Sequence, residues 1–420
     1  MHLFFNKLSL IDLKIVTRPL LHILIGLFIT FSSYYALITF SYGAWMYIFG
    51  IIALTCIAYG TFFKVKYLKY SAIYLGAVFA AFLFVEVYLE ITFRNLFVTS
   101  PIEMSGGCTL DGFYQTHPYL GYGPADEGAF SCKKTIDSEE LIFDITYSLA
   151  EGQRVTPNSN LKSSDAALFF GCSFTYGEGL EDNETIPAYF NELADNRFKV
   201  FNYGFSGYGP HQMLANIEKR VARDIEDVSG EKIAVYTFIP DHIKRATGKT
   251  PWGRSGPRYE LVNGEIEYRG SYNFQSPEYQ GSSLERRFFT ALHASRLYYQ
   301  WFIAGKVKKH DIERTVGMIE KSNRILTENG VTFHMVIWDL DQIIETFGSE
   351  KQFEYFTEKL DELNIPFVLM SDSISPFEYS DYTIHPMDPH PNEKATKVIA
   401  NSIFKKTGLG TETSFATTIK

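Results

Sequence analysis

Three long apolar runs dominate the first hundred residues. They cover residues 20–40, 44–63 and 70–93, and only a few residues separate each run from the next. Each run is about 20 residues or longer, which is enough for a helix to cross the hydrocarbon core of a bilayer. A cleaved signal peptide would instead show one shorter apolar stretch and a small-residue cleavage site. The pattern predicts a membrane region of three spanning helices within residues 1–93.

Positive charges give these helices an expected orientation. Lys7, Lys14 and Arg18 precede the first run, and three more lysines lie between the second and third runs. Because basic loops stay on the cytoplasmic side of a membrane, we expect the chain to leave the third helix in the periplasm or outside the cell. Glu86 and Glu90 lie one helical turn apart near this exit. We expect them to reach interfacial water rather than to line a functional path.

After about residue 166 the chain alternates short apolar strands with longer amphipathic segments. The predicted strands are 167–171, 199–203, 232–239, 332–338 and 367–370, and the predicted helices include 186–194, 211–223, 311–328 and 350–363. This alternation is typical of a parallel sheet with helices on both faces. It predicts an α/β fold, a three-layer αβα domain with a parallel five-stranded sheet, over residues 166–408.

Three further segments complete the expected organisation. Residues 251–282 interrupt the alternation, and the Asn263-Gly264 pair within them predicts a β-hairpin, which we interpret as an insertion beside the site. Residues 94–165 are rich in glycine, proline and aromatic residues but have little periodicity, and we expect a lead-in or cap that packs against the sheet. Residues 409–420 form a polar tail.

Composition excludes some functions. The net charge is -9 and the chain has no long Lys/Arg tract, which argues against nucleic-acid binding because phosphate neutralisation needs a clustered basic face. No Cys/His/carboxylate set has the spacing of metal ligands, and no glycine pattern suits a nucleotide phosphate. We therefore predict neither a metal nor a cofactor. Cys108 and Cys132 follow the membrane region and could form a disulfide in an oxidising compartment.

Polar blocks follow three of the apolar segments, and in an open parallel sheet the active site gathers beyond the carboxyl ends of the strands. The first block is GCSFTYGEG, residues 171–179. A serine directly after a buried strand can hold its hydroxyl at the rim of the sheet and direct its own N–H toward a developing oxyanion. Ser173 is thus a candidate nucleophile, although a helix N-cap would also explain it.

The other two blocks are NYGFSGYGP, residues 202–210, and DPHPN, residues 388–392. The glycines of the second block let the backbone approach a ligand closely, and they would equally suit a tight turn. In the third block, Asp388 can hold one imidazole nitrogen of His390 while the other faces a serine hydroxyl. Surface loops contain many such Asp/His pairs, so the third block is informative mainly in combination with the first.

In this order, the three blocks resemble those of the SGNH or GDSL hydrolase superfamily, whose domain is a flavodoxin-like αβα sandwich. The first family block, G-D-S-x-x-x-G, is similar to Gly171, Ser173 and Gly177, with Cys172 at the position of the family's Asp. The second resembles residues 202–207, and the resemblance implies that the Gly207 amide joins that of Ser173 in the oxyanion hole.

The last family block carries the catalytic acid and base. It resembles Asp388 and His390, which lie two positions apart rather than the family's three. The following Pro-Asn and the predicted helix match the family better around His390 than around His385.

A further family block departs from the pattern. The family has Gly-x-Asn after the third strand, where this chain has Asp241. An ionised Asp cannot donate a hydrogen bond to an oxyanion, so Asp241 is either protonated or structural, or His242 or another group supplies the third donor. His211, after the second block, is a candidate substrate contact or a surface residue.

The resemblance implies a serine esterase or acyltransferase with Ser173, His390 and Asp388 as its triad. Membrane-anchored members resemble enzymes that add or remove O-acetyl groups on cell-surface or cell-wall carbohydrate, and a lipid esterase is a third option. The expected partners are the bilayer, an acylated carbohydrate or ester substrate and, for transfer, a membrane acyl-donor protein. The competing hypothesis is an inactive binding or assembly subunit of a polysaccharide modification or export complex, which Asp241 favours.

Overall fold

A computed structural model describes residues 44–62, 65–98, 101–109, 112–250, 252–273, 282–285, 292, 295–298, 307–341 and 343–409. The chain forms two compact units: residues 1–100 with 282–304, and residues 101–281 with 305–420. The predicted helix at 20–40 and residues 410–420 of the predicted tail lie outside the described residues.

The first unit contains a helical hairpin. Helices α2 (Ala44–Phe62) and α3 (Lys66–Val98) pack closely where a Cβ on Gly76 would lie 2.7 Å from Ile57. Residues 66–92 of α3 are long and apolar enough to cross a membrane, whereas the apolar part of α2 covers only residues 45–58, which is shorter than a span requires. The described residues therefore include one candidate membrane span by length and composition, where the sequence predicts three in the whole chain.

Glu86 and Glu90 differ from the sequence expectation. Both are buried, with 0 % and 5 % of their surface exposed. The Glu86 carboxylate accepts hydrogen bonds from the Ser295 hydroxyl and, at 3.3 Å, from the Leu297 amide at the start of α10 (Arg296–Tyr298). The expectation of contact with interfacial water is wrong for Glu86 because its carboxylate binds the amino-terminal end of this short helix instead.

A parallel five-stranded sheet forms the centre of the second unit. Its strands are β7 (Ala166–Phe170), β8 (Lys199–Asn202), β9 (Lys232–Phe238), β12 (Thr332–Ile337) and β13 (Phe367–Leu369). Their order across the sheet is β13-β12-β9-β7-β8, and every neighbouring pair is parallel. The predicted α/β fold and its five strands are confirmed, with each strand end within one residue of its predicted position.

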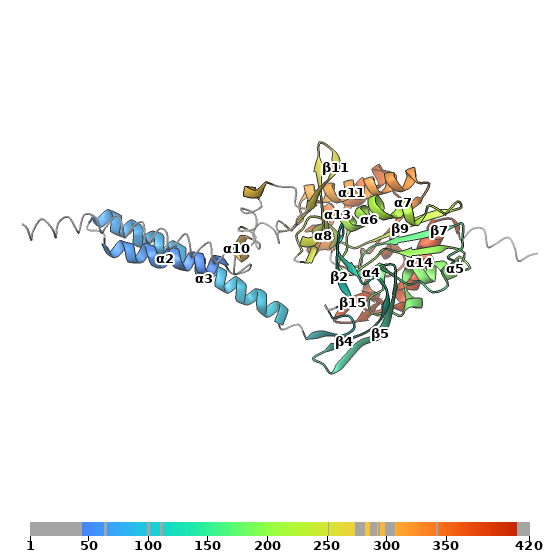
Figure 1. The fold of residues 1–420 in the computed structure, drawn as a ribbon, viewed down its shortest axis with the longest axis horizontal. Coiled ribbons are helices and arrows are strands. Elements are labelled where there is room, and N and C mark those ends of the chain that lie inside the picture. Colours follow the sequence, from blue (N-terminus) through green and yellow to red (C-terminus); the bar gives the residue numbers. More distant parts are fainter. Residues whose placement is uncertain are drawn as a thin grey trace, which may run out of the picture. The chain divides into compact units, whose positions relative to one another are not determined.

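Helices cover both faces of this sheet (Figure 1). The helices are α5 (Ile186–Leu193) and α14 (Glu393–Lys406) on one face, and α6 (Pro210–Asn216), α11 (Lys309–Glu328) and α13 (Glu350–Glu362) on the other. Alternate side chains of β7 enter opposite cores, because neighbouring strand residues point to opposite faces. Ala167 and Phe169 face α5 and α14, whereas Leu168 and Phe170 face the other helices.

Shorter elements connect these layers. They are α4 (Ser173–Tyr176), η1 (Asp182–Glu184), a π-helical turn η2 (Ile217–Val221), α7 (Ala222–Asp224), α8 (His242–Ala246), η3 (Trp252–Ser255), α12 (Ile343–Phe347), η5 (Met370–Asp372), η6 (Pro376–Tyr382), β14 (Thr383–His385) and β15 (Asp388–Pro391). The predicted helix at 211–223 is α6, η2 and α7 in succession. The predicted hairpin is also present as β10 (Pro257–Val262) and β11 (Glu265–Ser271). Asn263 and Gly264 both have positive φ, as a type I′ turn requires.

The segment before the parallel sheet contains strands that its irregular pattern did not indicate. An antiparallel sheet has the order β1-β4-β5-β6, formed by β1 (Ile102–Gly106), β4 (Gly128–Ile136), β5 (Glu140–Ala150) and β6 (Gln153–Arg154). A separate hairpin joins β2 (Tyr114–His117) to β3 (Gly121–Pro124). Aromatic side chains from these strands share a core with Tyr176, Phe205 and Tyr208. The segment thus packs against the loops that follow β7 and β8.

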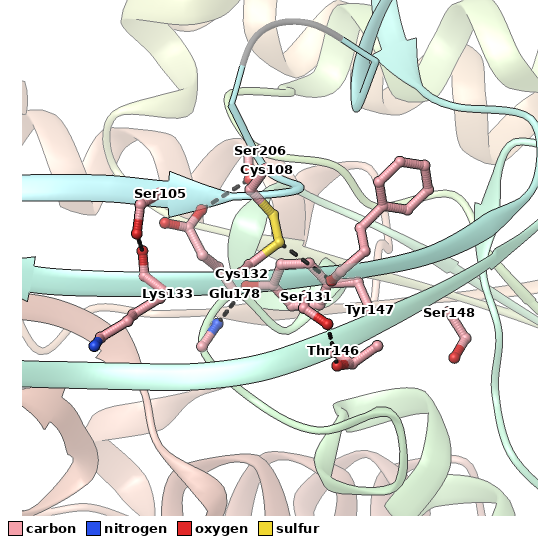
Figure 2. The surroundings of a disulfide bond; sticks show 12 residues. Ser105, Cys108, Ser131, Cys132, Lys133, Thr146, Tyr147, Ser148, Glu178 and Ser206 are labelled. Carbon is pink, nitrogen blue, oxygen red and sulfur yellow. Dashed lines mark hydrogen bonds between the residues drawn. A yellow bond between two sulfur atoms is a disulfide. The ribbon is translucent and has the colours of Figure 1, made fainter.

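A disulfide joins Cys108 to Cys132 (Figure 2). It connects the loop after β1 to β4, next to the pairing of Gly106 with Cys132. Figure 2 shows Glu178 and Ser206 close to this bridge, linked to each other by a hydrogen bond. The disulfide therefore ties β4, the strand that carries Lys134, covalently to the loop after β1.

Candidate active site

The three residues predicted as a triad lie together in the structure. The Ser173 hydroxyl oxygen is 2.9 Å from Nε2 of His390, and Nδ1 of His390 is 2.5 Å from Oδ1 of Asp388. Ser173 begins α4 directly after β7, whereas the other two residues belong to β15, more than 200 positions later. This continuous hydrogen-bond chain is the arrangement that lets an imidazole remove a serine proton.

A tight turn at Gly171 and the side chain of Asn202 position Ser173 after the end of β7. Gly171 has a φ of 154°, and a Cβ at this position would lie 2.1 Å from the Thr175 hydroxyl, so the turn from strand to helix leaves no room for a side chain. Asn202 then joins the first two blocks. Its side chain donates to the Thr175 carbonyl at 3.1 Å and accepts from the Gly204 amide at 3.0 Å.

The third block is held by the helix that follows it. The Asn392 side chain caps α14 by accepting from the Ala395 amide at 3.0 Å, and it donates to the Thr383 carbonyl of β14, also at 3.0 Å. These bonds fix the β14–β15 hairpin that carries His390. His385, the alternative base, has its Nε2 3.0 Å from the carboxylate of Glu140 instead.

A cavity of about 620 Å³ opens beside the serine. Ser173, His390 and Gly207 line it together with Tyr114, Tyr122, Glu178, Ser206, Arg245, Trp252 and Ser255. Among the described residues, no acceptor is hydrogen-bonded to the backbone amide of Ser173 or to that of Gly207. Gly207 has a φ of 81°, and a Cβ there would lie 2.4 Å from the Tyr122 hydroxyl. Both amides that the resemblance assigns to the oxyanion hole therefore belong to residues at the cavity.

Asp241 forms an ion pair with Arg245 in this structure. Its carboxylate accepts from Nε of Arg245 at 2.8 Å, so it acts as an acceptor and supports a neighbouring side chain. Arg245, not Asp241, lines the cavity. This arrangement matches the structural alternative for Asp241, and it provides a donor at the cavity that the sequence blocks did not identify.

His211 and His242 lie in the interior. Neither has exposed surface or lines the cavity, and Nδ1 of His242 is 2.8 Å from the Tyr236 hydroxyl. Burial, together with the charge of Arg245, lowers the pKa of His211 to about 3, so this imidazole is neutral. The alternative of a surface position for His211 is wrong, because α6 packs that side chain inside the protein.

Burial and charge oppose each other in the triad. Burial disfavours ionised Asp388, but the hydrogen bond to His390 and the nearby Lys134 lower its pKa overall. Burial likewise disfavours the His390 imidazolium, but the carboxylates of Glu178 and Asp388 raise the pKa of His390 overall. The site therefore favours an ionised Asp388 and stabilises positive charge on His390, which is the state that follows removal of the serine proton.

Comparisons with known proteins give only distant structural matches. No family model matches the chain, and no curated protein matches it. Solved structures similar to it include a protein described as lipolytic and of the G-D-S-L family from Desulfitobacterium hafniense (10 % identity, TM-score 0.36, 58 % of this chain and 99 % of that one). An acetylxylan esterase from Geobacillus stearothermophilus is also similar (11 % identity, TM-score 0.32, 59 % and 96 % of the two chains).

In this chain, Ser173, His390 and Asp388 are linked by hydrogen bonds at the carboxyl ends of the parallel sheet, and Ser173 and His390 line the cavity together with Gly207. Among the described residues, no group of three or more His, Cys, Asp or Glu is placed to hold a metal ion.

Sequence reasoning missed several residues of the site. Arg245, Tyr122 and Trp252 line the cavity, and Lys134 contacts Asp388 at 2.8 Å. Glu178 lies inside the first block, five positions after Ser173, so its place in that block could have suggested a role. No motif marks Lys134, because it reaches the triad from an antiparallel strand whose pairing is not evident in the sequence.

Proposed function

We propose that this protein is a membrane-anchored serine esterase or acyltransferase that acts on O-acetyl groups of cell-surface or cell-wall carbohydrate. The observation that carries the proposal is the hydrogen-bond chain from Ser173 through His390 to Asp388 beside the cavity. In this mechanism His390 takes the proton of Ser173 as the hydroxyl oxygen attacks an ester carbonyl. His390 then donates that proton to the departing alcohol, and an acyl-enzyme remains.

The acyl-enzyme can react with either of two acceptors. Water gives an esterase, and a sugar hydroxyl gives a transferase by the same route. A carbohydrate is favoured because Tyr114, Tyr122 and Trp252 line the cavity together with charged groups. Aromatic rings provide flat apolar contacts for the C–H faces of a sugar, while the polar groups can bind its hydroxyls.

The expected location also supports a carbohydrate substrate. Helix α3 is a candidate membrane span, and the positive charges before the apolar runs favour an extracytoplasmic position for the second unit. A domain in that place meets surface polymers more readily than cytoplasmic metabolites. Full anchoring through three helices, with the domain in the periplasm or outside the cell, is part of this proposal.

Arg245 is the third oxyanion donor in the proposed mechanism. Its Nε binds Asp241 and its Nη1 donates to the Tyr208 carbonyl at 3.0 Å, and a guanidinium has five N–H donors in total. N–H groups therefore remain for a substrate oxygen. Asp241 would act through Arg245 by fixing its orientation.

The Arg245→Met variant should lose about 10²- to 10³-fold in kcat, the usual effect of removing one oxyanion donor. KM should change much less, because the lost interaction forms with the charged intermediate. Steady-state kinetics with 4-nitrophenyl acetate would measure both constants, and Arg269→Met on the exposed surface of β11 is the matched control. A change confined to KM would show that Arg245 binds the ground-state substrate instead.

The substrate class can be tested with the full-length protein in detergent micelles. We expect turnover of acetyl esters and of an O-acetylated oligosaccharide to exceed turnover of octanoyl esters, measured as acid release. Transfer of a deuterated acetyl group to an unacetylated oligosaccharide, measured by mass spectrometry, would identify a transferase. A preference for octanoyl esters would instead indicate a lipid esterase. Oligosaccharide binding without turnover of any ester would favour the binding subunit.

A further inference from the structure

A second carboxylate lies at the opposite side of the catalytic imidazole from Asp388. Oε2 of Glu178 is 3.7 Å from Nε2 of His390, the nitrogen that faces the serine. The same oxygen accepts a hydrogen bond from the Ser206 hydroxyl at 2.8 Å. Asp388 binds the other ring nitrogen at 2.5 Å. Carboxylates therefore face both nitrogens of His390.

One lysine connects the two carboxylates. Nζ of Lys134 lies 2.8 Å from Oδ2 of Asp388 and 3.0 Å from Oε1 of Glu178. The Lys134 side chain comes from β4 and is 11 % exposed, so water screens these ion pairs less than it would at the surface. His390, Asp388, Glu178 and Lys134 thus form one charged cluster, in which Asp388 and Lys134 are buried and His390 and Glu178 are partly buried.

The backbone around Glu178 is held in place. The buried Arg154 side chain donates to the carbonyls of Tyr176 at 2.9 Å and of Leu180 at 2.5 Å. The Gly179 amide donates to the Tyr147 hydroxyl at 2.9 Å. These bonds fix the chain on both sides of Glu178, so its carboxylate is oriented before a substrate arrives.

We propose that Glu178 and Lys134 are positioning residues that act on His390, with Glu178 stabilising the imidazolium and Lys134 limiting that stabilisation. This inference rests on the proposed function, since it concerns the same catalytic base. With neutral His390 the cluster carries two negative charges and one positive charge. When Ser173 gives its proton to Nε2, the cluster becomes neutral overall. Glu178 takes no proton, because His390 returns that proton to the departing alcohol.

The arrangement has a consequence for the pH range of activity. Burial disfavours the imidazolium, Glu178 and Asp388 raise the pKa of His390, and Lys134 lowers it. The other charged or titratable groups at the cavity are Arg245, Tyr114 and Tyr122. Burial raises the pKa of Tyr114 to about 12 and also raises the pKa of Tyr122, so both phenols are neutral. Only neutral His390 can act as a base, so activity should fall as the pH drops below the pKa of this imidazole.

Two substitutions should therefore move the acidic limb of the pH profile of kcat/KM in opposite directions. Glu178→Gln removes a negative charge and should lower the pKa of His390, shifting the limb to lower pH by about one to three units, the usual effect of a charge at this range. Lys134→Met removes the positive charge and should shift the limb to higher pH. The double variant should lie between the two single variants.

The experiment uses full-length protein in detergent, with wild type, both single variants and the double variant. Lys133→Met on β4 and Glu192→Gln on α5 are the matched controls, because both side chains are exposed, and their profiles should coincide with that of wild type. NMR titration of the His390 ring protons gives the same pKa values without requiring turnover. If one single variant fails to fold, the remaining single variant is compared with the double variant. The double variant removes one negative and one positive charge, so its net charge equals that of wild type.

Opposite shifts in both readouts would support the inference. If wild type is active but the two variants keep its acidic limb and its His390 titration, the inference is overturned, even if kcat falls. If Ser173→Ala is as active as wild type, the proposed function fails instead. The two failures are therefore distinguishable.

Discussion

Ser173→Ala should abolish ester turnover while leaving the fold intact. We expect kcat to fall by about 10⁶-fold, as it does when the nucleophile of a triad is removed. The loss is chemical because the Ser173 hydroxyl is the atom that would bond to the acyl carbon, and its described hydrogen bond is to His390 at 2.9 Å. The thermal midpoint should change by only a few degrees, since the variant removes one oxygen at the cavity.

The measurement is kcat with 4-nitrophenyl acetate for the full-length protein, with circular dichroism as the check of folding. Ser373→Ala is the control, because its exposed hydroxyl lies 3.1 Å from that of Ser402 and does not line the cavity beside Ser173. Retention of more than about a hundredth of the wild-type kcat by a folded Ser173→Ala variant would place the nucleophile elsewhere.

Asp388→Asn should lower kcat by about 10⁴-fold. The Asp388 carboxylate accepts from Nδ1 of His390 at 2.5 Å, and this bond keeps the proton on the nitrogen that faces away from Ser173. An amide can present its NH₂ group to Nδ1, which favours the wrong tautomer and leaves Nε2 unable to accept the serine proton. The imidazolium would also lose the charge that stabilises it.

Kinetics and the thermal midpoint should be compared with those of Asp372→Asn, whose carboxylate is exposed. We expect the control to match wild type in both measurements. A loss of less than tenfold in Asp388→Asn would show that the carboxylate does not orient the base. A large loss of kcat accompanied by an equally large loss of folded protein would indicate a structural role for Asp388.

Much of the fold could be predicted because its parallel strands are short, continuous apolar runs. Residues 167–170 and 233–238 read clearly as strands, since both faces of the sheet are covered by helices and every side chain is buried. The antiparallel strands β4 and β5 gave no such signal. Their side chains are partly exposed and glycines interrupt the segment, so their pairing depends on contacts with distant parts of the chain.

The same difference applies to the site. Ser173, Asp388 and His390 lie in blocks at the ends of elements, and the blocks could be recognised from their residue types and order. The roles of Arg245 and Lys134 follow from tertiary contacts. Arg245 lies on α8 and pairs with Asp241, and Lys134 reaches Asp388 from β4. Neither has a spacing relation to the triad that a single sequence reveals. For His211 the sequence is misleading in another way: a polar residue near a helix start is usually at the surface, but this side chain is fully buried.

Covalent labelling of Ser173 tests the central claim most directly. A fluorophosphonate probe reacts with a serine only when a neighbouring base activates the hydroxyl and an oxyanion hole receives the developing charge. We expect full-length protein treated with the probe to carry one adduct on the peptide containing residues 171–179, located at Ser173 by tandem mass spectrometry. Labelling should be absent in Ser173→Ala and strongly reduced in His390→Ala. An unlabelled but folded wild-type protein, or equal labelling in Ser173→Ala, would contradict the account.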